Sequence, residues 1–190
     1  MISWSIHIAT QEDYREIVSC FASSSEALPA DSRLEEERAD NLLQRLSEDI
    51  EDHHVLVIRQ RKTVLGFAII AHSLEDEFFP KTHSYRKSSD ILEDAGHRGE
   101  PLLILRALFV LPAYQKQGLG AELLKSLFAT HKGASWLLIV EENNQSAVTF
   151  FKAHGFFPCG DPDGLEWGEK KKMILAKRYR PAGLCREAYW

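Results

Sequence analysis

A glycine-rich turn is the part of the sequence best suited to bind a charged ligand. Residues 115–120 read Gln-Lys-Gln-Gly-Leu-Gly, between an apolar run and a helical pattern. Glycines allow a ligand to approach the backbone closely, and the free N–H groups and dipole of a following helix favour an anion such as a pyrophosphate. Gln115 adds a neutral donor and Lys116 a positive one. The string alone fits a plain tight turn equally well, but its place in the chain favours an anion site.

Two other phosphate-binding motifs do not fit this turn. No Gly-Lys-Ser/Thr follows it, as a Walker loop requires, and the spacing is not Gly-x-Gly-x-x-Gly. The sequence therefore gives no support for hydrolysis of a nucleoside triphosphate.

Hydrophobic periodicity predicts the elements that position the turn. The apolar run 102–111 is interrupted only by Arg106 and predicts a strand buried on both faces. Leucines at helical spacing after Gly118 predict an amphipathic helix. Elsewhere we expect strands at 5–9, 55–58, 64–71, 136–140 and 172–177, and helices at 34–50, 146–154 and, capped by Thr10 and Asp13, from residue 11. This order predicts a single mixed α/β domain over residues 1–190.

Composition narrows the classes of partner. The chain has 190 residues, 44% of them hydrophobic, and a formal net charge of −5. A mildly acidic protein lacks the cationic surface that non-specific binding to nucleic acid or to an anionic membrane requires. We therefore expect a small-molecule or peptide partner, and a cationic one is favoured.

Cysteine usage and the N-terminus predict a cytoplasmic protein. Cys20, Cys159 and Cys185 have no metal-ligand spacing, so neither a disulfide framework nor a metal site is expected. No signal-peptide pattern opens the chain, and no apolar stretch approaches the length of a membrane span.

Two segments fall outside this pattern. Residues 73–101 are polar and rich in acids, among them Glu75, Asp76 and Glu77, and are interpreted as either a loop near a site or a solvated insertion. The tail 178–190 is apolar for a terminus, so it is expected to pack on its own domain or on a second subunit of a homodimer.

Two motifs resemble those of the GNAT superfamily of N-acetyltransferases. Residues 104–128 resemble its acyl-CoA motif, a strand ending in Val-x-Pro followed by Gln/Arg-x-x-Gly-x-Gly/Ala. Residues 144–156 are similar to its second motif, Asn-x-x-Ala-x-x-Phe-Tyr-x-x-x-Gly-Phe. The resemblance covers residues 5–177 apart from 73–101.

This resemblance implies a fold and a substrate. The family's mixed sheet separates at the C-terminal ends of the strands 102–111 and 135–140, and the pantetheine arm of acetyl-CoA, the cosubstrate, lies in the gap. A free primary amine of the acceptor then attacks the thioester in a ternary complex, and a backbone donor near Val110 would stabilise the oxyanion. The implied cofactor-binding residues are Leu108, Phe109, Val110, Gln115, Lys116, Gln117, Gly118, Leu119, Gly120, Ala121, Asn144 and Phe151.

The sequence departs from the family where protons are transferred. Residues 102–110 lack the carboxylate that often serves as base, and Phe151 stands where the family has the tyrosine that protonates the CoA thiolate. Because an amine of the lysine type is almost fully protonated at neutral pH, another base is needed. Glu141 is the first candidate base, although a solvated loop acid is the more common interpretation of such a residue. His72 is the second candidate, and Tyr85 is a candidate acid.

Other residues are weaker candidates. Arg106 is expected to bind an acceptor carboxylate or to pair with an acid on a neighbouring strand. His154 and Cys159 are interpreted mainly as structural. Because two catalytic side chains of the family are missing, the alternative to an enzyme is a module that binds acyl-CoA without transferring the acyl group.

Overall fold

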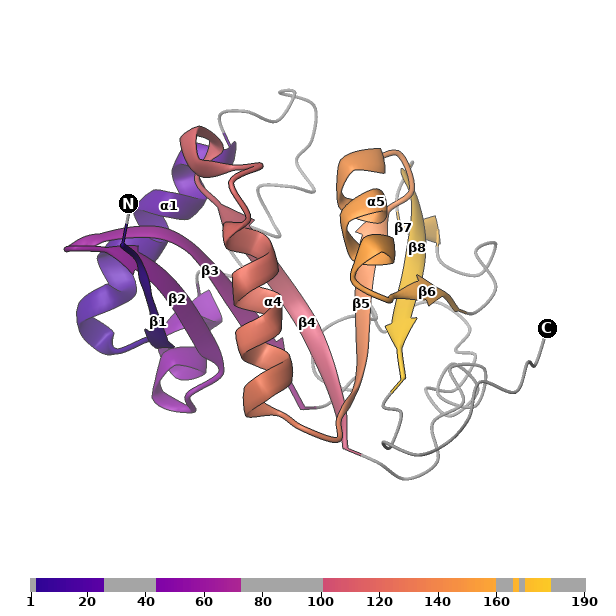
Figure 1. The fold of residues 1–190 in the computed structure, drawn as a ribbon, viewed down its shortest axis with the longest axis horizontal. Helices are drawn as coiled ribbons and strands as arrows, with labels where there is room; N and C mark the ends of the chain where they lie inside the picture. The colour runs from indigo at the N-terminus through magenta and orange to yellow at the C-terminus, as the bar shows by residue number, and fades with distance from the viewer. Residues whose placement is uncertain (1–2, 26–43, 73–100, 160–165, 168–169, 179–190) are drawn as a thin grey trace. The chain divides into compact units, whose positions relative to one another are not determined.

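The computed structural model describes residues 3–25, 44–72, 101–159, 166–167 and 170–178. Strands and helices are mixed along the chain (Figure 1). The elements are β1 Ser5–Ile8, a 3₁₀ turn Gln11–Asp13, α1 Tyr14–Ser25, a helix over 44–51, β2 Val55–Gln60, β3 Thr63–Ala71, β4 Leu102–Val110, a 3₁₀ turn Pro112–Tyr114, α4 Leu119–Thr130, β5 Ser135–Glu141, α5 Gln145–Ala153, β6 Phe157–Pro158, β7 Glu166–Trp167 and β8 Lys170–Lys177.

The strands form one mixed sheet in the order β1-β2-β3-β4-β5-β8-β6, and β7 pairs with β8. β1 with β2, β2 with β3, and β5 with β8 are antiparallel, whereas β4 and β5 are parallel. The predicted mixed α/β class is therefore confirmed. β3 is a central strand, because it lies between β2 and β4.

The contacts group into two compact units, which are described separately. The first comprises Met1–Ala71 and Leu105–Thr130, and the second comprises His72–Ile104 and His131–Trp190. The single-domain assignment over residues 1–190 stays a prediction.

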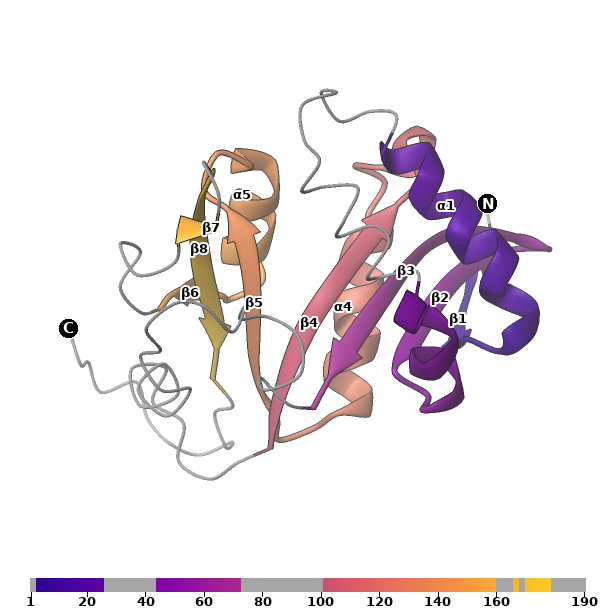
Figure 2. The same ribbon diagram turned by 180° about the vertical axis from the view of Figure 1, so that it is seen from behind.

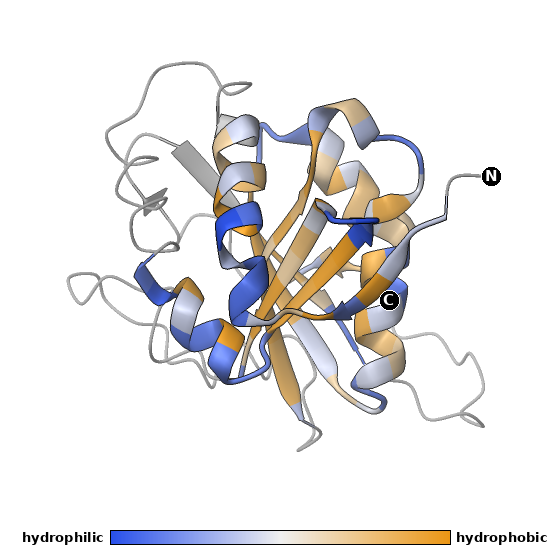
Figure 3. Cartoon of the chain, turned by 90° about the vertical axis from the view of Figure 1, so that its left-hand side faces the viewer, coloured by the Kyte–Doolittle hydropathy of each residue, from blue (hydrophilic) through white to orange (hydrophobic). Residues whose placement is uncertain are grey.

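The first unit is built around one face of the sheet. Buried Ile17 of α1 and Leu46 of the helix over 44–51 pack with Phe67 of β3 in one hydrophobic cluster. The Phe109 ring joins them, stacked on Phe67 with a centroid distance of 5.3 Å and edge-on to Phe21 at 5.0 Å. Figure 3 shows the hydrophobic colours concentrated on the strands of the sheet. This packing fixes β4 against β3, and so fixes the start of the glycine-rich turn.

The second unit is built around β5 and β8, which pair from Trp136 opposite Lys177 to Glu141 opposite Lys172. Leu137, Ile174 and Cys159 form its core cluster. Asn144 caps α5, because its side-chain oxygen accepts a hydrogen bond from the Ala147 N–H at 3.1 Å.

Several boundaries differ from expectation. β4 is not buried throughout: Arg106 and Leu108–Val110 are half-buried, while Leu103–Leu105 and Ala107 are buried. Within the described residues, β4 pairs with β5 only through Leu102–Ile104. The separation of the two strands beyond that point stays a prediction. Of the helix expected over 34–50, only the part from residue 44 lies among the described residues, and the short strands β6 and β7 were not expected. The segment 73–101, except residue 101, and the tail 178–190, except residue 178, lie outside the described residues.

No helix in the described part of the chain is long and apolar enough to cross a membrane.

Candidate functional site

The end of β4 leads directly into the glycine-rich turn. The Leu111 N–H donates to the Leu65 carbonyl at 2.8 Å, which ties the end of the strand to β3. A 3₁₀ turn, Pro112–Tyr114, follows, and α4 begins at Leu119, whose side chain is buried. Figure 2 shows β3 and β4 running in opposite directions. The predicted strand, turn and helix are thus confirmed in order.

The turn presents a row of free backbone donors. The N–H groups of residues 116–121 make no hydrogen bond to any other described residue. The Glu122 N–H is the first to resume helical bonding, to the Gly118 carbonyl at 3.0 Å. Free N–H groups at a helix N-terminus, together with the positive end of the helix dipole, attract an anion. The turn is therefore able to bind a pyrophosphate group.

The backbone conformation of the turn aligns these donors. Lys116 has a φ of 59° and Gly118 a φ of 87°, so both lie in the left-handed region. For a residue with a side chain this conformation costs about 1–2 kcal/mol, and such strain is concentrated at functional sites. Successive N–H groups in a turn of this kind can form a concave surface that binds anions. The exposed ammonium group of Lys116 adds positive charge to this turn.

Two glutamine side chains bond to the backbone of this region. Gln115 Nε2 donates to the Val110 carbonyl at 3.0 Å, and Gln117 Nε2 donates to the Ala113 carbonyl at 3.0 Å. Both side chains are exposed. The sequence indicated Gln115 as a donor to a ligand, whereas in this structure its amide is engaged by the chain itself.

The end of β4 offers backbone groups more than side chains. Phe109 packs into the core and its carbonyl faces β3, where a Cβ on Gly66 would come within 2.4 Å of it. Because alternate residues of a strand direct their backbone groups to opposite edges, those of Leu108 and Val110 point away from β3. This agrees with a backbone role for these residues, and their contact with acetyl-CoA stays a prediction.

Three of the predicted site residues lie on β5 and α5 or directly between them. Asn144 is exposed and caps α5, while the Phe151 ring is buried and lies edge-on to Phe150 and Phe156 at 5.2 and 5.5 Å. Glu141 ends β5 directly opposite Lys172 of β8. The role of Glu141 as a base stays a prediction.

The other candidates for proton transfer are His72, Tyr85 and His154. His72 directly follows β3 and is exposed, and Tyr85 lies outside the described residues. His154 ends α5, and its Nδ1 lies 2.8 Å from the Phe150 carbonyl. Lys177 Nζ donates to the His154 carbonyl at 2.5 Å, and burial lowers the pKa of Lys177. His154 therefore has the structural role that the sequence favoured.

Arg106 and Cys159 have structural partners. The Arg106 guanidinium binds Asp49, so the expected partner on a neighbouring strand is wrong: the acid comes from the helix over 44–51. The sequence predicted a helix at 34–50, but it gave no signal that Asp49 of this helix reaches β4. Cys159 is buried in a hydrophobic cluster, and its N–H donates to the Ile174 carbonyl at 2.9 Å.

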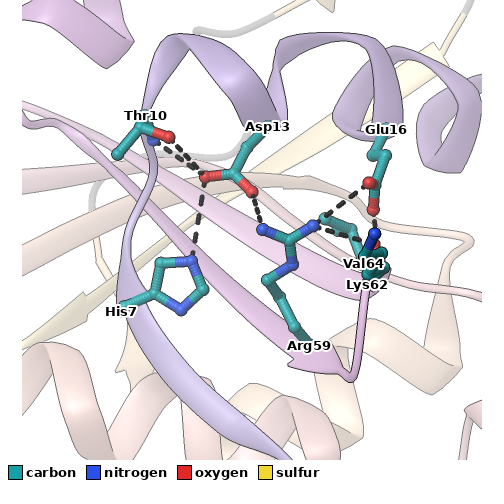
Figure 4. A network of polar contacts seen from close by, with 7 residues as sticks. All are labelled: His7, Thr10, Asp13, Glu16, Arg59, Lys62 and Val64. Atoms are coloured by element: carbon teal, nitrogen blue, oxygen red, sulfur yellow. Dashed lines mark hydrogen bonds and ion pairs between the residues drawn. The ribbon is translucent and has the colours of Figure 1, made fainter.

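A polar network that the sequence only partly indicated fastens α1 to the sheet (Figure 4). The Asp13 side chain is 1% exposed, accepts a hydrogen bond from the Thr10 N–H at 2.9 Å and pairs with Arg59 at 2.5 Å. Arg59 also bonds to Glu16 at 3.1 Å, and Glu16 accepts the Val64 N–H at 2.9 Å. The capping pair Thr10 and Asp13 was expected and is confirmed, but the sequence gave no sign that Arg59 joins it.

Among the described residues there is no group of three or more His, Cys, Asp or Glu able to hold a metal ion.

Comparison with known proteins assigns the family. The model of the acetyltransferase (GNAT) domain matches residues 51–158, which is more than half of the chain and includes β2 to α5. The chain belongs to the GNAT acetyltransferase family. The resemblance drawn from the two motifs is therefore confirmed. Among curated proteins, none matches this GNAT chain significantly.

Solved structures show the same fold at low identity. A GNAT-family acetyltransferase from Bacillus cereus has a TM-score of 0.64 and 14% identity, with 94% of this chain and 99% of that one covered. The PaiA N-acetyltransferase from Thermoplasma acidophilum, solved with coenzyme A, has a TM-score of 0.62 and 15% identity over 93% and 99%. Naa50 from Arabidopsis thaliana, solved with a bisubstrate analogue, has a TM-score of 0.59 and 14% identity over 94% and 100%. At such identity these structures establish the GNAT fold of the chain, and its acceptor is not identified by them.

Proposed function

We propose that this GNAT protein transfers the acetyl group of acetyl-CoA to a primary amine of a small molecule or peptide. The observation that carries the proposal is the row of free N–H groups at residues 116–121, at the start of α4 and beside the Lys116 ammonium. This site fits the doubly charged pyrophosphate of coenzyme A. The structure of PaiA with coenzyme A supports the choice of ligand.

The chemistry follows from a thioester and a free amine. The amine nitrogen forms a bond to the acetyl carbon, the carbon–sulfur bond breaks, and the amine loses a proton. A thiol pKa near 8.5 makes the thiolate a fair leaving group, so coenzyme A can depart without a protonated tyrosine. The protein's part is to hold the pyrophosphate on the turn and to present the backbone of Leu108 and Val110 to the rest of the substrate.

The amine's proton requires a base, for which Glu141 is the first candidate and His72 the second. Glu141 is the last residue of β5. An ionised carboxylate is the form that accepts a proton. Tyr85 is proposed as the acid.

The acceptor is proposed to be cationic and the site of action cytoplasmic. The net charge of −5 favours a protonated amine as the encounter partner. The cysteine spacing in the sequence favours a reducing compartment. Pairing of two copies through the tail 178–190 is part of the same proposal.

A binding module that holds acyl-CoA without transfer is the second candidate. The observation favouring it is Phe151, a buried ring packed between Phe150 and Phe156, where no proton donor stands. Strand β4 also carries no carboxylate.

Release of free coenzyme A separates the two candidates. Purified protein is incubated with acetyl-CoA and a panel of polyamines, aminoglycosides, amino acids and peptides with free N-termini, and thiol release is measured. Amine-dependent release with an acetylated product supports the enzyme, and Glu141→Gln should then lower turnover and change its pH profile. Tight binding of coenzyme A without release for any amine supports the module.

A further inference from the structure

Gln115 connects the end of β4 with the glycine-rich turn. It opens the glycine-rich turn, yet its side chain reaches back five residues and donates from Nε2 to the Val110 carbonyl at 3.0 Å. Val110 is the last residue of β4. The bond therefore joins the end of the strand to the start of the anion-binding turn.

The Val110 carbonyl points away from β3. The Phe109 carbonyl and the Leu111 N–H both face β3, so the Val110 carbonyl points to the opposite edge of β4. The described residues provide no backbone donor for it. Without Gln115, this carbonyl would be free to accept one of the N–H groups of the turn, or would leave its partial negative charge uncompensated close to an anion site.

Gln117 repeats the arrangement one step along the chain. Its Nε2 donates to the Ala113 carbonyl at 3.0 Å. Two side-chain amides thus occupy two carbonyls that precede the row of N–H groups. A neutral amide does this without an added charge, and leaves the backbone donors of residues 116–121 unpaired.

We propose that Gln115 is a positioning residue for the anion site: by occupying the Val110 carbonyl, it holds the turn in the conformation that keeps the N–H groups of residues 116–121 available to a pyrophosphate. This inference rests on the proposed binding of acetyl-CoA. It assigns the side chain of Gln115 to the protein's own backbone, where the sequence had assigned it to the ligand.

Gln115→Met tests the inference, because methionine has a similar length and no donor. Gln11→Met is the matched control, since Gln11 is also exposed and also donates from Nε2 to a backbone carbonyl, that of Ser47 at 3.1 Å. For each protein, the dissociation constants of coenzyme A and of pantetheine, which lacks the pyrophosphate, are measured by calorimetry. Thermal melting checks that both variants fold.

Loss of one stabilising hydrogen bond in the binding conformation predicts that Gln115→Met binds coenzyme A about three- to tenfold more weakly. Its affinity for pantetheine should stay within about twofold of the wild type, as should both affinities of Gln11→Met. An unchanged affinity of Gln115→Met for coenzyme A overturns the inference, and so does an equal loss for pantetheine, which would mean that Gln115 acts on the arm. If the wild-type protein binds no coenzyme A, the proposed function itself fails.

Discussion

The Arg106 guanidinium holds the Asp49 carboxylate with one nitrogen, because Nη1 lies 2.9 and 2.8 Å from its two oxygens. The two side chains are 9% and 8% exposed, so the pair is almost withdrawn from water. It joins the helix over 44–51 to the middle of β4, four residues before the Val110 carbonyl that Gln115 occupies. Burial raises the pKa of Asp49 above its usual value, and Arg106 opposes this shift.

Replacing one residue of this ion pair should lower the free energy of unfolding more than replacing both. Arg106→Met leaves a buried carboxylate without its cation, and is expected to lower the free energy of unfolding by about 3–5 kcal/mol. Replacing both residues, Arg106→Met with Asp49→Leu, should cost much less, because no buried charge remains. Urea unfolding at pH 7 measures both. An equal loss in the single and double variants would show that the ion pair itself supplies the stability.

The pH dependence of Arg106→Met follows from the same carboxylate. With Arg106 gone, Arg45 and His54 still lower the Asp49 pKa, but the strongest opposing interaction is lost, so the folded state binds this proton more tightly than the wild type or the unfolded chain does. The free energy of unfolding of this variant, relative to wild type, should therefore fall as the pH rises through the raised pKa of Asp49 in the folded variant. Unfolding measured between pH 4 and 8 tests this sign, and a relative stability that rises with pH contradicts it.

Gly66 is needed for the close approach of β3 to the end of β4. A Cβ at this position would lie 2.4 Å from the Phe109 carbonyl and 3.2 Å from Val110 Cα, both backbone atoms. Gly66→Ala should therefore push the strands apart and destabilise the protein by about 2 kcal/mol or more. Ala68→Gly, on the same strand, is the comparison: it deletes a buried methyl group and should cost about 1 kcal/mol. Thermal or urea unfolding compares the two, and a harmless Gly66→Ala would contradict the close approach.

A negative side chain in the first turn of α4 should prevent binding of coenzyme A. Gly120→Glu places a carboxylate among the free N–H groups of residues 116–121, where it both fills space and repels a pyrophosphate. Binding of coenzyme A, followed by calorimetry, should fall below detection. Lys125→Glu is the control, because Lys125 lies on α4 at an exposed position beyond this turn. Undiminished affinity in Gly120→Glu would sink the assignment of the turn as the pyrophosphate site.

The parts of the fold that the sequence predicted are those with local signals. Periodicity located β4 and α4, and the spacing of Thr10 and Asp13 located the start of the first helix, since each depends on residues close in the chain. The partners of Arg106 and Arg59 were missed because each lies about fifty positions away, and a lone cation in an apolar run does not indicate which acid it meets. Gln115 was assigned to the ligand for a similar reason: a motif specifies a donor, but only the backbone path shows which carbonyl it reaches.

Cys20 should be unreactive in the native protein. It is 2% exposed in the core of the first unit, and burial raises the pKa of its thiol to about 11. At pH 8 only about one thiol in a thousand is then ionised, and the thiolate is the reactive form. Iodoacetamide labelling followed by mass spectrometry should therefore modify Cys20 only in denaturant. The raised pKa also means that the folded state disfavours ionisation of this thiol. The free energy of unfolding should therefore fall as the pH rises from about 9 towards 11. Cys20→Ala should remove the contribution of this thiol to that decrease. Rapid native labelling of Cys20, or an identical pH dependence in Cys20→Ala, would contradict its burial as a neutral thiol.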